Sequence, residues 1–328
     1  MRKILVFLVC IIQFPDSGCQ SWEIFNTQLR AERKGSTLEV STPDRRKSLV
    51  IEADSAFLDM ATEMLFFKKD GLAGIIDPGS LELLNEASFT ALVKVSENFF
   101  LVHDREGSYF SRNEFPIKPV LERFTSVHPF SDNVFPHFFI AERKGKFGLV
   151  STENGVLNYL VKPEYDEILP EKAENEAIFY YLRKGKKWGS GSCEGVEVQP
   201  GYDRIRLLKG ECMSAIYLVW KKGLCGIVYA SDSKPLADCI YQIIEYKEAG
   251  NEDFLLFFSS EGLSELGQID MFDKSLIYYE PLMVLKISEK NKTLLVYKDQ
   301  DGLSSLEFSE QEAERLGLQS LEWLFIEN

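Results

Sequence analysis

Histidine is scarce in this chain of 328 residues, with three copies at His103, His128 and His137. Their separations of 25 and 9 residues match no H-E-x-x-H or related metal-ligand spacing. The sequence also has no G-x-S-x-G nucleophile elbow, no P-loop and no dinucleotide-binding glycine fingerprint. We therefore predict a protein that is not an enzyme and that uses no metal and no cofactor.

Basic residues are outnumbered, because 37 Lys and Arg stand against 51 Asp and Glu, for a net charge of -14. Nucleic-acid binding draws most of its affinity from a basic face, so this balance argues against a nucleic-acid partner. Long hydrophobic runs are absent too, since no segment reaches the roughly 20 apolar residues that span a bilayer. A hydrophobic content of 45% is nevertheless enough for a substantial core.

The first 19 residues have the layout of a secretory signal. Two basic residues precede a nine-residue apolar run, Ile4 to Ile12, and small residues follow at 15–19. We predict a signal peptide over 1–19 and export to the periplasm, the outer membrane or the cell surface. Ser17-Gly18-Cys19 resembles a lipoprotein box with Cys19 as the lipidated residue, which would be the protein's sole membrane attachment. Ordinary cleavage near Cys19 is the alternative.

The remaining cysteines are few and clustered. Four of them, Cys193, Cys212, Cys225 and Cys239, fall within one stretch of 47 residues. An oxidising envelope favours disulfides among them, and four cysteines allow three pairings between which the sequence does not choose. The alternative is that they are small buried apolar residues in strands.

What the chain has in abundance is self-similarity. The segment Ala31–Gly35 recurs unchanged as Ala141–Gly145. Charged turns that end in glycine recur at intervals of 36 to 40 residues, at positions 35, 71, 107, 145, 185, 223, 262 and 302. Apolar runs precede most of these turns and follow several of them. Strand, glycine turn and strand predict a β-hairpin in each repeat.

A second landmark follows some of the turns. Pro163–Ile168 and Pro200–Ile205 alternate apolar and polar residues, and each is predicted to be a third, half-exposed strand. Together with Lys144–Val150 and Lys184–Gly189, these segments resemble the WG β-repeat family, in which K-G-K-W-G-L-I-D is followed by I-P-x-Y-D-x-I. The resemblance covers about half of the chain. It implies an all-β repeat protein of bacteria in which binding is more often suspected than catalysis.

The predicted fold is therefore an all-β repeat array of about eight hairpin-based units of roughly 38 residues, forming a single domain over 20–328. We favour an open twisted array, with a closed β-propeller as the alternative. Ser309–Glu312 is a capping box that predicts a short helix, and 309–328 would cap the array. Less regular segments predict a helical turn within Asp54–Met64 and a bulge or loop at Gly189–Ser192.

Aromatic residues are the best candidates for a recognition surface. Tyrosine and tryptophan are enriched in binding sites, and Trp188, Tyr165, Tyr202 and Trp220 lie in or beside the clearest repeats. Packing in the core is the alternative role for all four. We predict an exported, monomeric protein that presents its surface to a protein or peptide partner. The alternatives are a carbohydrate-binding module or glycan-active enzyme of the cell envelope, and a structural spacer.

Overall fold

In the computed structural model the described residues form antiparallel β-sheets and one short α-helix, and the chain divides into two compact units, 1–164 and 165–328. Each unit is described by itself. The structure describes residues 20–23, 28–59, 64–130, 137–171, 178–210, 215–230, 234–250, 252–260, 262–270, 273–279, 281–287, 292–299 and 302–318. The predicted signal peptide and Cys19 lie outside these residues, as does the part of the cap after position 318.

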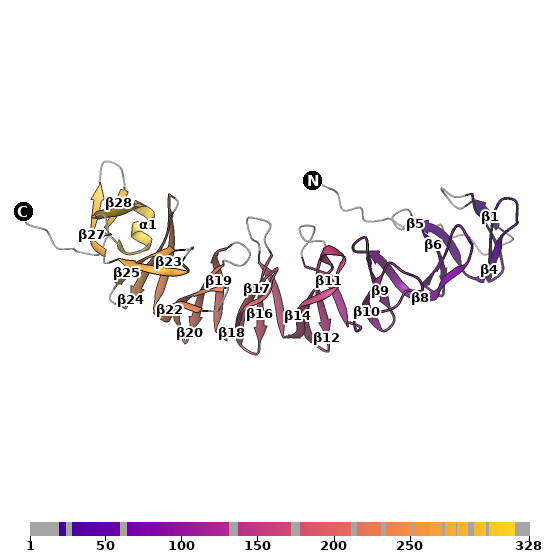
Figure 1. Cartoon of the computed structure of the whole chain (residues 1–328), viewed down its shortest axis with the longest axis horizontal. Coiled ribbons are helices and arrows are strands. Elements are labelled where there is room, and N and C mark those ends of the chain that lie inside the picture. Colours follow the sequence, from indigo (N-terminus) through magenta and orange to yellow (C-terminus); the bar gives the residue numbers. More distant parts are fainter. Residues whose placement is uncertain are drawn as a thin grey trace, which may run out of the picture. The chain divides into compact units, whose positions relative to one another are not determined.

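Unit 1 contains three antiparallel sheets (Figure 1). The first has the order β1 (Gln20–Glu23), β2 (Arg30–Lys34), β3 (Thr37–Ser41) and β4 (Ser48–Glu52). The second has the order β10 (Gly107–Arg112), β9 (Phe99–Asp104), β8 (Leu83–Lys94), β7 (Leu72–Ile76), β6 (Met64–Lys69) and β5 (Ser55–Asp59). The third has the order β11 (Ser126–Pro129), β12 (Phe138–Arg143), β13 (Lys146–Ser151) and β14 (Asn158–Tyr165). A 3-10 turn, Glu153–Gly155, precedes β14.

The six-stranded sheet holds two of the predicted hairpins because one long strand joins them. The first part of β8 pairs with β7 from Leu83 to Phe89, and the last part pairs with β9 from Phe89 to Lys94. Two repeat hairpins therefore share β8, which is why eight turns give seven sheets.

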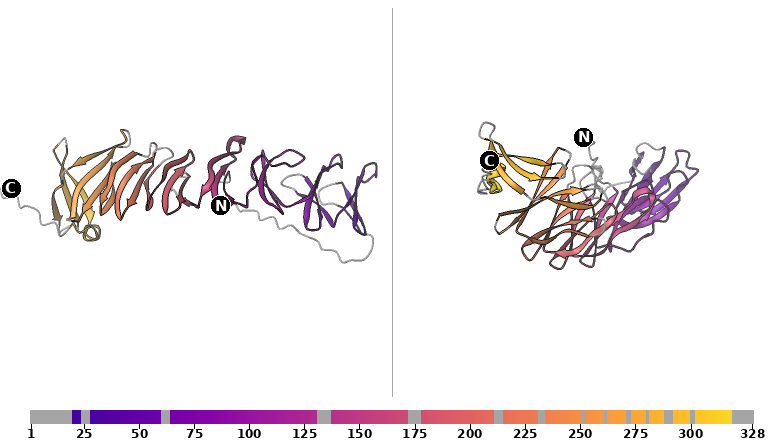
Figure 2. Two further views of the ribbon diagram at one scale, coloured as in Figure 1. Left: turned by 90° about the horizontal axis from the view of Figure 1, so that it is seen from below. Right: turned by 60° about the vertical axis from the view of Figure 1, so that its left-hand side comes forward.

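Unit 2 contains four sheets that follow one another in chain order (Figures 1 and 2). The first sheet has the order β15 (Glu167–Glu171), β16 (Phe179–Lys184), β17 (Lys187–Ser192) and β18 (Gly195–Tyr202). The second has the order β19 (Arg204–Lys209), β20 (Ile216–Lys221), β21 (Leu224–Tyr229) and β22 (Lys234–Tyr241). The third has the order β23 (Ile243–Ala249), β24 (Glu252–Ser259), β25 (Gly262–Asp270) and β26 (Ser275–Tyr279). The fourth has three strands, β27 (Pro281–Ile287), β28 (Lys292–Lys298) and β29 (Leu303–Ser309).

The repeat turns are confirmed at all eight glycines. Each of them has a positive φ: Gly35, Gly71, Gly107, Gly145, Gly185, Gly223, Gly262 and Gly302. In the turn between β20 and β21 both central residues, Lys222 and Gly223, have positive φ values of 55° and 84°. This geometry is that of a type I′ turn, whose twist matches that of the strands it joins. The all-β repeat fold is therefore confirmed. The choice between an open array and a closed propeller stays a prediction.

The predicted third strand is wrong in one respect, because the chain changes sheet within it. In the segment 200–205, β18 ends at Tyr202 and β19 of the next sheet begins at Arg204. Asp203 lies between them; its N–H donates to the Trp220 carbonyl (2.8 Å) and its Oδ2 accepts from the Lys222 N–H (2.7 Å). Asp54 and Asp166 make the same two kinds of bond. The aspartate of the repeat thus fixes the turn of the next hairpin.

The core of unit 2 lies between consecutive sheets. Phe257 of β24 is fully buried in a cluster shared with the sheet of β19–β22, whereas Phe254 and Phe258 belong to a cluster shared with β27–β29. Alternate residues of β24 therefore face different neighbouring sheets. Burial on both faces explains why the central strands have continuous apolar runs rather than alternating ones.

One local expectation is contradicted over the residues that the structure describes, and another is confirmed in part. Of the segment Asp54–Met64, residues 55–59 form β5 and not a helical turn, because they pair in register with Met64–Lys68 of β6, and residues 60–63 lie outside the described residues. Gly189–Ser192 is not a loop but the buried end of β17, although the pairing with β18 does contain the expected bulge. The small residues make room for a neighbouring ring, since a Cβ at Gly191 would lie 2.4 Å from the Tyr180 hydroxyl.

The predicted C-terminal helix is confirmed as α1 (Glu310–Arg315). Its capping box is complete: the Glu312 N–H donates to Ser309 Oγ, and Glu312 Oε2 accepts from the Ser309 N–H at 2.9 Å. The helix is also tied to β23, because Lys247 Nζ lies 3.0 Å from Glu312 and Arg315 lies 2.9 Å from Glu245. The helix therefore caps the last sheets of unit 2 through one buried residue, Ala313, and two ion pairs.

Acid is expected to weaken this cap. The Ser309 N–H and the Lys247 ammonium lower the pKa of Glu312 to about 2, from an ordinary value of 4.5. A lowered pKa means that the charged carboxylate contributes stability above about pH 4.5, and that this contribution is lost as the pH falls toward 2. We expect Glu312→Gln to lower the unfolding midpoint at neutral pH and to have almost no effect near the lower pKa. Thermal unfolding followed by circular dichroism across this range measures the difference.

The exposed Glu314 of the same helix provides the control. At neutral pH, Glu314→Gln should lower the unfolding midpoint less than Glu312→Gln does, because no hydrogen bond or ion pair of the Glu314 side chain is seen among the described residues. A Glu312→Gln effect that did not shrink in acid would contradict the assigned role of the carboxylate.

Candidate functional site

Tyr165 was predicted to lie on a recognition face, but its side chain belongs to the core. It is 4% exposed, and Lys184 Nζ lies 5.7 Å from the centre of its ring. The terminal tyrosine of this repeat therefore packs and does not offer a surface.

The other three predicted aromatics are half-buried and do not share one face. Trp188 and Tyr202 are cross-strand neighbours on β17 and β18, and both pack against the cluster between the first two sheets of unit 2. Trp220 packs on the other face of its own sheet, in the cluster that contains Phe257. Arg204 covers the Trp220 ring at 4.7 Å. The structure thus brings Trp188 and Tyr202 together but separates them from Trp220, which favours packing for these residues.

One histidine, His103, contacts a serine as a catalytic base would, but the serine is not accessible to a substrate. His103 Nδ1 lies 2.7 Å from Ser108 Oγ, which is the contact of a base with a serine nucleophile. Burial, followed by the nearby charge of His128, lowers the pKa of His103. Ser108 is 4% exposed, however, so its hydroxyl has no free path for a substrate carbonyl. Within the described residues no group of three His, Cys, Asp or Glu is placed to hold a metal ion.

Two of the clustered cysteines are thiols inside the sheet of β19–β22. Cys225 Sγ donates to the Tyr241 carbonyl at 3.3 Å, and burial raises its pKa to about 11. Cys239 Sγ donates to the Val219 carbonyl at 3.9 Å. Cys193 is half-buried, and Cys212 lies outside the described residues. Cys225 and Cys239 are therefore not joined in a disulfide in this structure, and a bridge between Cys193 and Cys212 stays a prediction.

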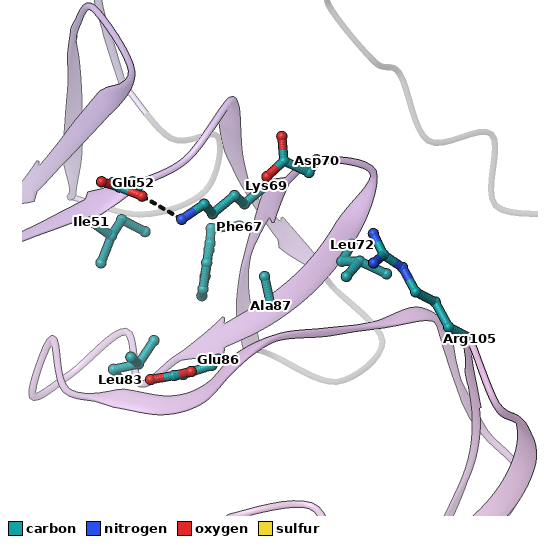
Figure 3. Close-up of a pocket in the computed structure, with 10 residues that line it drawn as sticks. All are labelled: Ile51, Glu52, Phe67, Lys69, Asp70, Leu72, Leu83, Glu86, Ala87 and Arg105. Carbon is teal, nitrogen blue, oxygen red and sulfur yellow. Dashed lines mark hydrogen bonds and ion pairs between the residues drawn. The ribbon is translucent and has the colours of Figure 1, made fainter.

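A groove of about 470 Å³ lies in unit 1, between β4 and the face of the six-stranded sheet (Figure 3). Its apolar lining consists of Ile51, Phe67, Leu72, Leu83 and Ala87. Its polar lining consists of Glu52, Lys69, Asp70, Glu86 and Arg105. The lining comes from β4, β6, β7, β8 and the turn after β9, so the packing of two sheets creates the site. An apolar floor with charged edges suits a peptide better than a free ion.

The charges of the groove are unevenly distributed. Lys69 forms an ion pair with Glu52, which is the main cause of the raised pKa of Lys69; the charges of Asp70 and Glu86 raise it further. Glu52 is thus paired with Lys69, and Asp70 and Glu86, which lie on opposite edges of the groove in Figure 3, add two further negative charges to its lining. In the view of Figure 3, Arg105 lies at the opposite end of the groove from Glu52. Away from Arg105 the groove therefore attracts a cation.

Strand β4 differs from most strands that end a four-stranded sheet. Three of the others, β14, β18 and β22, carry Pro163, Pro200 and Pro235 respectively. Proline on an edge strand hinders the addition of a further strand. Strands β4 and β26 have no proline, and β4 exposes Val50, which is 62% exposed. Of these two strands, β4 adjoins the groove.

Sequence reasoning missed the groove completely. Its residues are spread over 51–105, and Lys69 and Asp70 stand out in the sequence only as part of the repeat turn before Gly71. The one usable signal is the absence of proline from Ser48–Glu52, which becomes informative only when the strand is known to end a sheet.

Comparison with known proteins gives no family and no function. No family model matches the sequence, and no curated protein matches it. Among solved structures, a eukaryotic initiation factor matches at 9% identity and a TM-score of 0.28, over 90% of each chain. Hsv2p of Kluyveromyces lactis matches at 10% identity and a TM-score of 0.26, over 88% of this chain and 98% of that one.

The β-propeller domain of the Trilobed protease from Pyrococcus furiosus matches at 13% identity and a TM-score of 0.26, over 78% of this chain and 91% of that one. At such TM-scores none of these likenesses carries an argument about ligand, activity or ring closure. In the described part of the chain, the one helix is far too short to cross a membrane.

Proposed function

We propose that this chain is a non-catalytic β-repeat protein that binds an extended segment of a protein or peptide partner. One observation carries the proposal: a groove with an apolar floor opens beside β4, an edge strand that lacks the proline found on β14, β18 and β22. Extended peptides bind proteins by joining such edges, because main-chain hydrogen bonds supply affinity and pockets for alternate side chains supply specificity.

Location and family are part of the same proposal. The signal-like start supports export to the cell envelope with Cys19 as a candidate lipid anchor, and the repeat pattern supports kinship with the WG β-repeat family. The alternative of carbohydrate binding receives less support, because the one aromatic in the groove lining, Phe67, is buried and offers no exposed ring for a sugar.

The test is a thermal-shift comparison of peptides with glycans. Peptides selected from a displayed random library, and a panel of soluble cell-envelope glycans, would each be added to the purified protein. A ligand that binds the native state raises the unfolding midpoint, and the stabilisation grows with the logarithm of the ratio of its concentration to the Kd. We expect selected peptides to raise it and glycans to leave it unchanged.

Two variants locate the binding. Leu83→Asp places a charge on the groove floor at a residue that is 41% exposed, and should abolish the peptide shift. Val156→Asp makes the same kind of change at another exposed residue of unit 1, and should preserve it. A shift with glycans alone, or a peptide shift equal in both variants, would overturn the proposal.

A further inference from the structure

The free edge of β4 can be described residue by residue. Its neighbour β3 receives the backbone groups of alternate residues, because the Thr42 N–H donates to Lys47 O (3.0 Å) and the Ala53 N–H donates to Ser36 O (3.2 Å). In an antiparallel strand these directions alternate. The backbone N–H and C=O groups of the odd-numbered residues from 47 to 53 thus point toward β3. The N–H and C=O groups of Ser48, Val50 and Glu52 point away from the sheet.

The groove lies where a strand joined to this edge would pass. Ile51 and Glu52 of β4 line one side of the groove, and Leu83 and Ala87 of β8 are also part of its lining (Figure 3). Ile51 packs toward the cluster between the two sheets, so that face of the extended sheet would continue over the groove floor. The groove adjoins the C-terminal end of β4, so the side chains of an added strand that lie beside Ile51 and point to this face would contact apolar residues.

Charge indicates the chemistry of the occupant. Lys69 is paired with Glu52, Asp70 and Glu86 add negative charge on opposite edges of the groove (Figure 3), and the whole chain carries a net charge of -14. A second copy of this chain would bring the same excess of negative charge to the edge, which opposes pairing of two copies. A basic segment of another protein is attracted by both the local and the overall charge.

We propose that an extended segment of a partner protein adds to β4 as a fifth strand, with aliphatic side chains on the groove floor and flanking lysine or arginine residues beside Asp70 at one edge and Glu86 at the other. The proposal rests on the proposed function and deepens it, because it names the binding mode and the partner chemistry. Specificity comes from the carboxylates, and the outward backbone groups of Ser48, Val50 and Glu52 supply affinity.

The experiment uses synthetic heptapeptides of alternating valine and threonine, one set flanked by lysine and one by glutamate. Binding to the full chain is measured by isothermal titration calorimetry. We expect the lysine-flanked peptide to bind at least about tenfold more tightly than the glutamate-flanked one, and Glu86→Lys to reverse this order. Equal affinity of the two peptides for the wild-type protein would overturn the partner chemistry.

Strand addition is tested at Val50. Val50→Pro removes one outward N–H and leaves the bonds to β3 in place, so we expect a loss of about tenfold or more in affinity. Val50→Ala keeps the N–H and should bind within about twofold of the wild type. Equal binding by both variants would overturn strand addition.

A second measurement protects the test against a folding defect in Val50→Pro. N-methylation at alternate residues of a lysine-flanked peptide blocks one edge of the extended strand, so the peptide should not bind the wild-type protein when its methylated edge faces β4. Undiminished binding of peptides methylated in either register would also overturn strand addition.

Other outcomes separate the two proposals. Peptide binding that is lost in Leu83→Asp but unchanged in Val50→Pro would retain the proposed function and overturn strand addition. An absence of binding by every peptide, with or without lysine, would overturn both. A dimer of the wild-type protein that Val50→Pro converts to a monomer would show that a second copy occupies the edge, and would overturn the choice of partner.

Discussion

Gly189→Ala is expected to destabilise unit 2 by about 3 kcal/mol, because the new methyl group would overlap the backbone of the neighbouring strand. A Cβ at this position would lie 2.2 Å from Val198 O and 2.8 Å from Pro200 N. Backbone atoms cannot rotate away as a side chain can, so β18 would have to shift. Urea unfolding followed by tryptophan fluorescence measures the change, since Trp188 and Trp220 are half-buried in this unit.

The matched control is Gly201→Ala on β18. The nearest atom to a Cβ there is Gln199 O at 3.7 Å, an ordinary contact, and the residue is exposed. This substitution should change stability by less than about 0.5 kcal/mol, or stabilise slightly, since alanine loses less entropy than glycine on folding. Similar losses in the two variants would show that a general sensitivity of β17 and β18 to substitution, and not the close approach, explains the glycine.

The close approach at Gly189 also explains one element of the repeat pattern. A Cβ at Gly148 would lie 2.6 Å from Val161 O, and one at Gly226 would lie 2.6 Å from Ala237 O. In each case the second glycine of the hairpin lets the fourth strand of the sheet pass closely. The first glycine of the pattern has a different task, since it supplies the positive φ of the turn.

Turns and hairpins could be predicted from the sequence because their causes are local. A positive φ favours glycine, and a capping box needs residues only three positions apart, so both leave a readable mark. The change of sheet at Asp203 could not be predicted. It depends on hydrogen bonds to Trp220 and Lys222, residues about 17 to 19 positions away. Without those partners the segment has the alternation of a single strand.

The role of the aromatics was misjudged for a related reason. Because sheets pack on both faces of a central strand, even a large ring such as that of Tyr217 can be fully buried. In this fold a high aromatic content therefore reflects a large core and not a binding surface. The groove is defined instead by exposed charged residues and by the free edge of β4. Charges at Glu52 and Glu86 resemble those of any solvated strand until the two sheets are placed together.

Phe257→Ala is expected to cost about 3 to 5 kcal/mol, because it removes a fully buried ring from the cluster between two sheets of unit 2. The ring packs against Tyr241 at a centroid distance of 4.6 Å and against Tyr278 at 5.7 Å. Differential scanning calorimetry measures the loss, and should show the transition of unit 2 broadened as neighbouring sheets become less strongly coupled. Leu303→Ala, at a residue that is 71% exposed, is the control and should have little effect.

A double-mutant cycle makes the assignment specific. Gly267 faces the same ring, and a Cβ there would lie 2.9 Å from Phe257 Cε2. Gly267→Ala should therefore destabilise the wild-type protein but be tolerated when Phe257 is alanine, so the two losses should not add. Additive losses would mean that the methyl group meets some other obstacle. A coupling of about 1 kcal/mol or more would place the ring against this glycine, and would show that β25 uses a small residue to admit the side chain that joins one repeat to the next.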